Sequence, residues 1–120
     1  MKRVNAISAI LLAIPLIVFG ANYFLNFIQP PPDTSIGMDM LNSMREGGLM
    51  VFVALAHIVI GFLLLYGKTR FLAALLHFPI SLGIVLFHIT MMPAGLPLAT
   101  FLLITNALVL VDKERMASIL

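Results

Sequence analysis

The sequence has no cysteine and no tryptophan, and only 10% of its 120 residues are charged. Without cysteine the chain can form no disulfide, perform no thiol redox chemistry and offer no thiolate to a metal ion. The net charge of +2 is small and the basic residues form no stripe, which argues against a nucleic-acid partner. Soluble domains carry roughly a quarter charged residues, so the low charged fraction is typical of a membrane protein and not of a soluble domain.

Long apolar runs take up most of the chain, with 62% apolar residues and a mean hydropathy of +1.13. A helix needs about 20 mostly apolar residues to cross a bilayer. Four segments fit, within one integral membrane domain covering 1–120, and they are residues 4–28, 49–66, 71–92 and 96–111. The predicted fold is therefore all-α: a four-helix transmembrane bundle of antiparallel, up-and-down helices, with membrane lipid around it.

The connections differ in length. GKTR (67–70) and MPAGLP (92–97) are tight turns, whereas residues 29–48 form the only long polar stretch. Within it, IGMDMLNSMRE is expected to form a short interfacial helix capped by Thr34 or Ser35. The initial MKR also fits a signal peptide, but the following apolar run is too long and no A-x-A-like site closes it, which favours a retained first span.

Basic residues predict the orientation. On a four-span path only Arg45 falls on one side, and the other six fall together: Lys2, Arg3, Lys68, Arg70, Lys113 and Arg115. Because cytoplasmic loops are enriched in lysine and arginine, both termini are expected to be cytoplasmic, with the 29–48 loop outward. The chain is expected to be a multi-pass protein of the bacterial inner membrane.

Ionisable side chains recur at one spacing. His77 and His88 are eleven residues apart, three helical turns plus about 20°, so they share a face of the third span. Glu46 and His57 have the same spacing in the second span if its helix continues through the Gly-Gly pair after Glu46. In a hairpin centred at Gly67, residues of equal depth have position numbers that sum to 134. His57 then pairs with His77, and Glu46 with His88.

Two amides on the first span are expected to reach the outer level. We predict an outward-opening polar vestibule above the histidine pair, lined by Asn22, Asn26, Glu46 and His88. Asn106 on the fourth span is placed nearer the cytoplasmic side. Two interpretations stay open. Polar groups between membrane helices often form only stabilising interhelical hydrogen bonds, each worth about 0.6 kcal/mol on average. Ionisable groups inside a span, in contrast, indicate a functional site by default.

Three segments resemble the DoxX family of small four-span bacterial membrane proteins: LIVFGANYFLNFIQPPP, GGLMVFVALAHIVIGFLLLYGKTR and LLHFPISLGIVLFHITMMPAGLP. The resemblance implies a four-helix bundle associated with membrane redox systems, because relatives include subunits of thiosulfate:quinone oxidoreductase. His88 falls in the family's F-H pattern. Two positions depart from it: His57 stands where members often have an acidic residue, and Gly83 where they often have asparagine.

The favoured function is an accessory or quinone-interacting subunit of a membrane redox complex, because histidine, glutamate and asparagine can hydrogen-bond a quinone and move its protons. The sequence has no flavin, iron–sulfur or nicotinamide fingerprint, so electrons would come from a soluble or membrane oxidoreductase partner. Whether the chain is catalytic stays open, as does a homo-oligomer.

Other functions remain as alternatives. The chain is also compatible with a small membrane transporter, although no acidic residue lies within a predicted span, or with a structural membrane protein without a ligand. Haem between His57 and His77 is disfavoured, because few small residues flank them. A Cu(I) site is conceivable because thioethers bind soft metals, but methionine is an ordinary flexible hydrophobe, so no metal site is predicted. The methionines expected near the outward side are Met38, Met40, Met44, Met50, Met91 and Met92.

Overall fold

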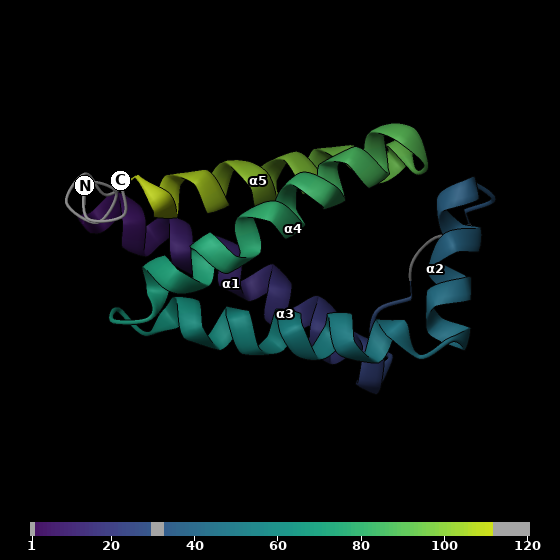
Figure 1. Ribbon diagram of the computed structural model, residues 1–120, viewed down its shortest axis with the longest axis horizontal. Coiled ribbons are helices and arrows are strands. Elements are labelled where there is room, and N and C mark those ends of the chain that lie inside the picture. Colours follow the sequence, from purple (N-terminus) through teal and green to yellow (C-terminus); the bar gives the residue numbers. More distant parts are fainter. Residues whose placement is uncertain (1, 30–32, 112–120) are drawn as a thin grey trace.

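The computed structural model describes residues 2–29 and 33–111, and every regular element within them is helical. Four long helices lie side by side, and a shorter one, α2, crosses one end of the bundle (Figure 1). The elements are α1 (Lys2–Leu25), α2 (Ile36–Glu46), α3 (Leu49–Leu65), α4 (Arg70–Thr90), the 3₁₀ turn η1 (Pro93–Gly95) and α5 (Leu96–Leu110). The molecule measures 45 × 27 × 22 Å along its principal axes.

Helix length and composition identify three segments that can cross a membrane: α1, α4 and the combined η1–α5 segment, Pro93–Leu110. The 17 residues of α3 span about 25 Å, slightly less than a hydrocarbon core of about 30 Å. With α2 it passes the same test, but the two helices are bent by 93°. The described residues therefore contain three spans, or four if α2 and α3 count as one.

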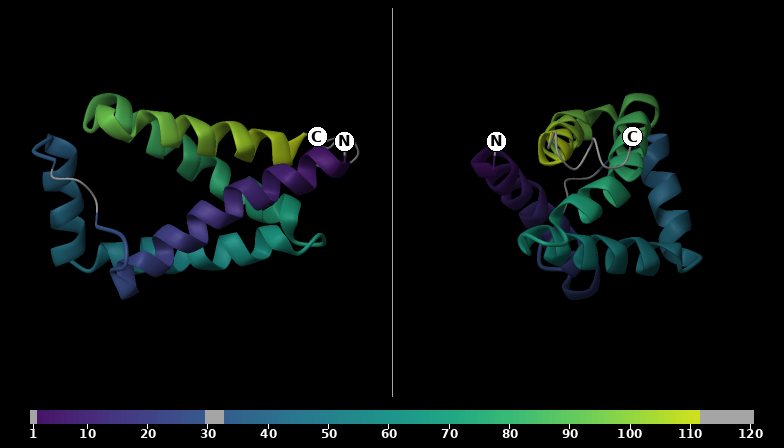
Figure 2. Two further views of the ribbon diagram at one scale, coloured as in Figure 1. Left: turned by 180° about the vertical axis from the view of Figure 1, so that it is seen from behind. Right: turned by 60° about the vertical axis from the view of Figure 1, so that its left-hand side comes forward.

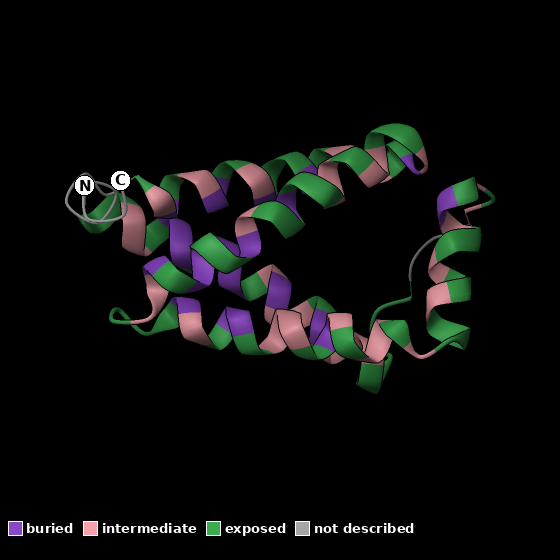
Figure 3. Cartoon of the chain, viewed as in Figure 1, coloured by how far each residue is buried: buried purple, intermediate pink, exposed green. Residues whose placement is uncertain are grey.

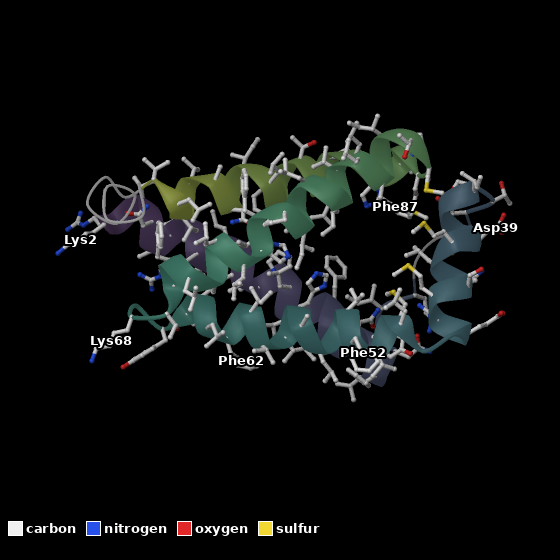
Figure 4. The ribbon with its side chains drawn as sticks, viewed as in Figure 1. Lys2, Asp39, Phe52, Phe62, Lys68 and Phe87 are labelled. Carbon is white, nitrogen blue, oxygen red and sulfur yellow. The ribbon has the colours of Figure 1, made fainter. Side chains whose placement is uncertain are left out.

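The outside of the bundle is apolar. Phe52 and Phe62 of α3 are 71% and 58% exposed and point away from the other helices (Figure 4). Leu86 of α4 is 61% exposed. In water a protein with such an apolar surface would aggregate, whereas in a bilayer the lipid tails solvate this surface. The chain is thus a small multi-pass membrane protein.

The helix that contains Glu46 does not continue through Gly47 and Gly48, although the predicted pairing of Glu46 with His88 requires a continuous helix there. α2 ends at Glu46, and Gly48 has a φ of +85°, in the left-handed region where a side chain is strained. Glu46 is exposed at the end of α2, so it shares no helix face with His57 and the proposed pairing of Glu46 with His88 loses its basis. The interfacial helix itself is present, and it begins after Ser35, whose hydroxyl makes no capping hydrogen bond.

The first helix ends three residues before its predicted boundary. Asn26 has a φ of +52°, a left-handed conformation that asparagine tolerates and that commonly ends helices. The side chain of Asn22 holds this end: its Oδ1 accepts from the Ile28 N–H over 2.7 Å, and its Nδ2 donates to the Ile28 carbonyl over 3.2 Å. Pro15 lies inside α1, which continues through it.

Helices α1 and α3 are held close by two glycines that face each other's helix. A Cβ added to Gly20 would lie 2.7 Å from Cγ1 of Ile58 and 2.8 Å from the Ala54 carbonyl oxygen. A Cβ on Gly61 would likewise collide with Ile17 of α1. Small residues at a helix contact let two backbones approach, which is how membrane helices gain van der Waals packing.

The described basic residues other than Arg45 lie at one end of the bundle. Lys2 and Lys68 lie at the end opposite Asp39 of α2 (Figure 4), and α1 begins where α5 ends (Figure 2). Arg70 donates from Nε to the Leu64 carbonyl over 3.0 Å, closing the α3–α4 turn. The arrangement matches the predicted clustering for the residues described, but Lys113 and Arg115 lie outside them. Which end faces the cytoplasm remains a prediction.

Burial is uneven along the bundle. Buried residues gather toward the α3–α4 turn, where all four long helices meet (Figure 3). The core there includes Leu12 and Leu16 of α1, Leu64 of α3 and Ala73 of α4. Toward α2, α4 rises away from α3 (Figure 1). The half of the bundle nearer the α3–α4 turn thus holds the apolar core.

Candidate functional site

The two histidines predicted to lie at equal depth are neighbours. The rings of His57 on α3 and His77 on α4 have centroids 5.3 Å apart and are tilted by 58°. The helices end at Leu65 and restart at Arg70, which centres the hairpin within one residue of the predicted Gly67. His57 is half-buried and His77 is completely buried.

A third helix contributes to this level through Asn106 of α5. Its Oδ1 lies 3.0 Å from Nδ1 of His77 and accepts from the Ser81 hydroxyl over 2.7 Å. The same hydroxyl lies 2.8 Å from His77 Nδ1, and Nδ2 of Asn106 donates to the Ala74 carbonyl over 2.8 Å. His77, Ser81 and Asn106 are all completely buried. We call these three residues the polar triad.

The hydrogen bonds of the polar triad do not involve one nitrogen of each ring in the histidine pair. Nε2 of His57 and Nε2 of His77 are buried and have no hydrogen-bond partner within the described residues. Burying a polar atom without a partner costs about 1–3 kcal/mol. Two such atoms on adjacent rings are therefore a feature that the packing alone does not explain.

The predicted pairing of the histidines does not include Asn106, although the sequence contains a signal for its contact with α4. The prediction uses, for α3 and α4 alone, the rule that residues of equal depth in a hairpin have position numbers of constant sum. Applied to α4 and α5, which end at Thr90 and restart at Leu96, it requires position numbers that sum to about 186. Ser81 and Asn106 sum to 187, so the same rule predicts their contact.

Next to the histidine pair, a cavity of about 430 Å³ lies between α2, α3 and α4. We call it the histidine cavity. Its lining is mostly aliphatic, aromatic or thioether, with two imidazoles: Met40, Leu41, Met44, Met50, Val53, His57, Ile80, Gly83, Ile84, Phe87 and His88. Figure 4 shows Phe87 at its α4 side and the sulfur atoms gathered along the bundle side of α2.

His88 is fixed at the far end of this cavity. Its Nδ1 lies 3.0 Å from the Met92 carbonyl oxygen, which can only accept, so this nitrogen donates. The ring packs on Gly95, where a Cβ would collide with it, and makes an edge contact with Phe87 at a centroid distance of 5.1 Å. The imidazole is therefore held by the α4–α5 connection.

The helix α2 forms the wall of the cavity at this end of the bundle. The Gly37 N–H donates to the Met91 carbonyl over 2.9 Å, and a Cβ on Gly37 would lie 2.8 Å from that of Met92. One end of α2 is thus docked on the α4–η1 turn, while the other meets α3 at the left-handed Gly48. Its cavity face carries Met40 and other apolar residues, and its polar residues are exposed.

The amides of the first span belong to a second cavity. It measures about 520 Å³ and is lined by Phe19, Asn22, Tyr23, Asn26, Ile28, Gln29, Arg45 and Met50. Arg45 lies over the Tyr23 ring, 5.8 Å from its centroid. Of the four residues predicted to line one vestibule, Asn22 and Asn26 thus line this cavity and His88 lines the histidine cavity. Glu46 lines neither of these two cavities.

Metal-binding groups are sparse in the described residues, where no cluster of three or more histidine, cysteine, aspartate or glutamate side chains occurs. Three of the six methionines noted in the sequence do line the histidine cavity: Met40, Met44 and Met50.

Comparison with protein-family models, curated proteins and solved structures finds no match for this chain. The resemblance to the DoxX family therefore remains a prediction. The helices and their hydropathy show a small, all-helical, multi-pass membrane protein with three or four spans.

Proposed function

We propose that this chain is a membrane-embedded binding subunit that takes a lipophilic ring compound of the quinone class into the histidine cavity. The observation that carries the proposal is the cavity itself, an apolar space of about 430 Å³ with His57 in its wall. Small-molecule sites are typically about 300–1,000 Å³, mostly apolar, with few polar groups that fix the ligand.

The two imidazoles suit a ring with oxygen at opposite ends. His57 and His88 line the same cavity from α3 and α4. The imidazole of His57 can donate to a quinone carbonyl or accept from a hydroquinone hydroxyl, whereas an uncharged His88, whose Nδ1 donates to the Met92 carbonyl, offers Nε2 as an acceptor. The flexible thioethers of Met40, Met44 and Met50 adapt to a flat ring and make favourable sulfur–aromatic contacts.

The cavity also suits a ligand that arrives from the bilayer. Met40, Ile80 and Gly83 line it and are exposed at the surface of the bundle. A ligand dissolved in lipid reaches such a site without crossing water.

The cellular role that we propose is an accessory subunit of a membrane redox complex in the bacterial inner membrane, with the basic end of the bundle in the cytoplasm. The DoxX-like segments and the distribution of lysine and arginine support it. Since the sequence carries no flavin or nicotinamide fingerprint, an oxidoreductase partner exchanges electrons with the bound quinone.

The alternatives have less support. Proton-coupled export of cations needs an acidic group in the membrane, and the four long helices contain no aspartate or glutamate. A soft metal ion would meet three thioethers, but the cavity is much larger than one ion. A purely structural role does not account for an apolar cavity with two imidazoles in its wall.

The test is binding of a short-tailed quinone to the full chain in lipid nanodiscs, measured by calorimetry. The decisive variant is Ile84→Trp, which fills the cavity from α4. Its matched control is Leu86→Trp on the exposed face of the same helix. We expect saturable binding to the wild type and the control, and its loss in Ile84→Trp. Absence of binding to the wild type, or equal binding to all three, overturns the proposal.

The redox role has its own readout. In membranes, Ile84→Trp should lower quinone-dependent electron transfer by the proposed oxidoreductase partner, whereas Leu86→Trp should not. If the quinone binds but no such activity depends on the chain, the site stands and the redox role fails.

A further inference from the structure

The donors and acceptors of the polar triad can be assigned in order, starting from a backbone carbonyl of α4. The Ala74 carbonyl can only accept a hydrogen bond, and it lies 2.8 Å from the Asn106 amide. The nitrogen of that amide must therefore face Ala74, because the reverse orientation would place two acceptors in contact. This leaves the Asn106 oxygen facing His77 and Ser81.

That oxygen decides which nitrogen of His77 carries the proton. The Ser81 hydroxyl has one hydrogen, and it donates to Asn106 Oδ1 over 2.7 Å. His77 Nδ1 lies 3.0 Å from the same oxygen and 2.8 Å from the Ser81 hydroxyl oxygen. Both contacts are favourable only if Nδ1 carries a hydrogen to donate. In a neutral imidazole, Nε2 of His77 is then a bare acceptor, completely buried and without a partner within the described residues.

The neighbouring ring of His57 can supply the hydrogen-bond donor that Nε2 of His77 lacks. His57 lies 5.3 Å away, centroid to centroid, and its own Nε2 is also buried without a partner. If His57 is protonated at Nε2, a ring rotation that brings the two Nε2 atoms within hydrogen-bond distance satisfies both of them. The remaining ring nitrogen of His57, Nδ1, then holds a lone pair, and it is the polar atom of this cavity-lining residue that can serve a ligand.

We propose that this relay of hydrogen bonds, from Ala74 through Asn106 and His77 to His57, makes the histidine cavity select ligands that donate a hydrogen bond. The proposal rests on the proposed function and adds a preference for the reduced, hydroquinone or phenol, form of the ring. A lone pair at His57 Nδ1 accepts from an O–H, whereas it makes no hydrogen bond with the carbonyl oxygen of a quinone, so the quinone binds in the same cavity but more weakly.

The tautomers can be observed in the wild-type chain. In nanodiscs, the ¹⁵N chemical shifts of the imidazoles distinguish a protonated from a bare nitrogen. We expect His77 to be protonated at Nδ1 and bare at Nε2, and His57 to be the reverse. A proton on Nε2 of His77 overturns the inference. This measurement needs no variant to fold.

Ligand selectivity is tested with two compounds of nearly equal shape, a short-tailed hydroquinone and its dimethyl ether, which has no O–H. Under reducing, anaerobic conditions the hydroquinone should bind about tenfold more tightly to the wild type, the value of one hydrogen bond. Asn106→Leu removes the orienting oxygen and should abolish this preference. Thr105→Val should keep it, because the Thr105 hydroxyl donates only within α5, to the Phe101 and Leu102 carbonyls.

The outcomes separate the two proposals. If the hydroquinone and its ether bind equally to the wild type, the selectivity is wrong and the binding site stands. If neither the two compounds nor the quinone binds, the proposed function fails and this inference with it.

Discussion

The side chain of Asn106 on α5 and the ring of His77 on α4 are joined through a 3.0 Å contact that neither helix could provide alone. This contact ties the histidine pair to three helices instead of two. It also lies inside the bundle, because His77, Ser81 and Asn106 are all completely buried.

Replacing Asn106 with leucine should destabilise the bundle by about 1–2 kcal/mol. The change leaves the Ala74 carbonyl and His77 without a partner, although hydrogen bonds between membrane helices are worth only about 0.6–1.7 kcal/mol. Unfolding in mixed detergent micelles measures the difference. Thr105→Val is the control, and an equal loss in both variants would show that the triad contributes nothing special.

Two glycines should respond in opposite ways to alanine. Gly20→Ala should destabilise the protein, because its Cβ would lie 2.8 Å from the Ala54 carbonyl oxygen, a backbone atom that cannot move aside cheaply. Gly83→Ala has open space and should gain up to about 1 kcal/mol from helix propensity. Both are helical, so thermal unfolding of the pair isolates packing from propensity. Equal effects would contradict the close contact between α1 and α3.

The bend between α2 and α3 should depend on one glycine of its pair. Gly48→Ala forces a side chain into the left-handed region and should cost about 1 kcal/mol. Gly47→Ala is the control, because Gly47 has a φ of −79° and can accept alanine without strain. A straightened α2–α3 helix would also open the histidine cavity, so quinone binding should weaken in Gly48→Ala alone. Identical behaviour of the two variants would argue against a fixed bend.

Helix positions and the His57–His77 pairing follow from the sequence because apolar run length and hairpin arithmetic are local properties. The bend after Glu46 does not, since Gly-Gly is compatible with both a continuous helix and a break, and the choice depends on the docking of Gly37 against Met91. The position of Glu46 outside both cavities has the same origin. Once α2 turns by 93°, Glu46 is carried away from His88.

The orientation of the bundle can be tested because the chain has no native cysteine. Glu46, at the end of α2, and Lys68, in the α3–α4 turn, lie at opposite ends of the molecule, so the test uses the variants Glu46→Cys and Lys68→Cys. In intact cells, a membrane-impermeant maleimide should label only the Glu46→Cys variant if the basic end is cytoplasmic. Labelling of Lys68→Cys alone would reverse the orientation, and labelling of neither at equal expression would place both ends out of reach.

The most direct test of the central claim is to map where a photoreactive quinone reacts with the wild-type chain in lipid nanodiscs. The account predicts adducts confined to the walls of the histidine cavity, on residues such as Met44, Ile84 and Phe87, and their loss when excess unlabelled quinone competes. Adducts spread over lipid-facing residues such as Phe52 and Phe62, unaffected by competition, would contradict it.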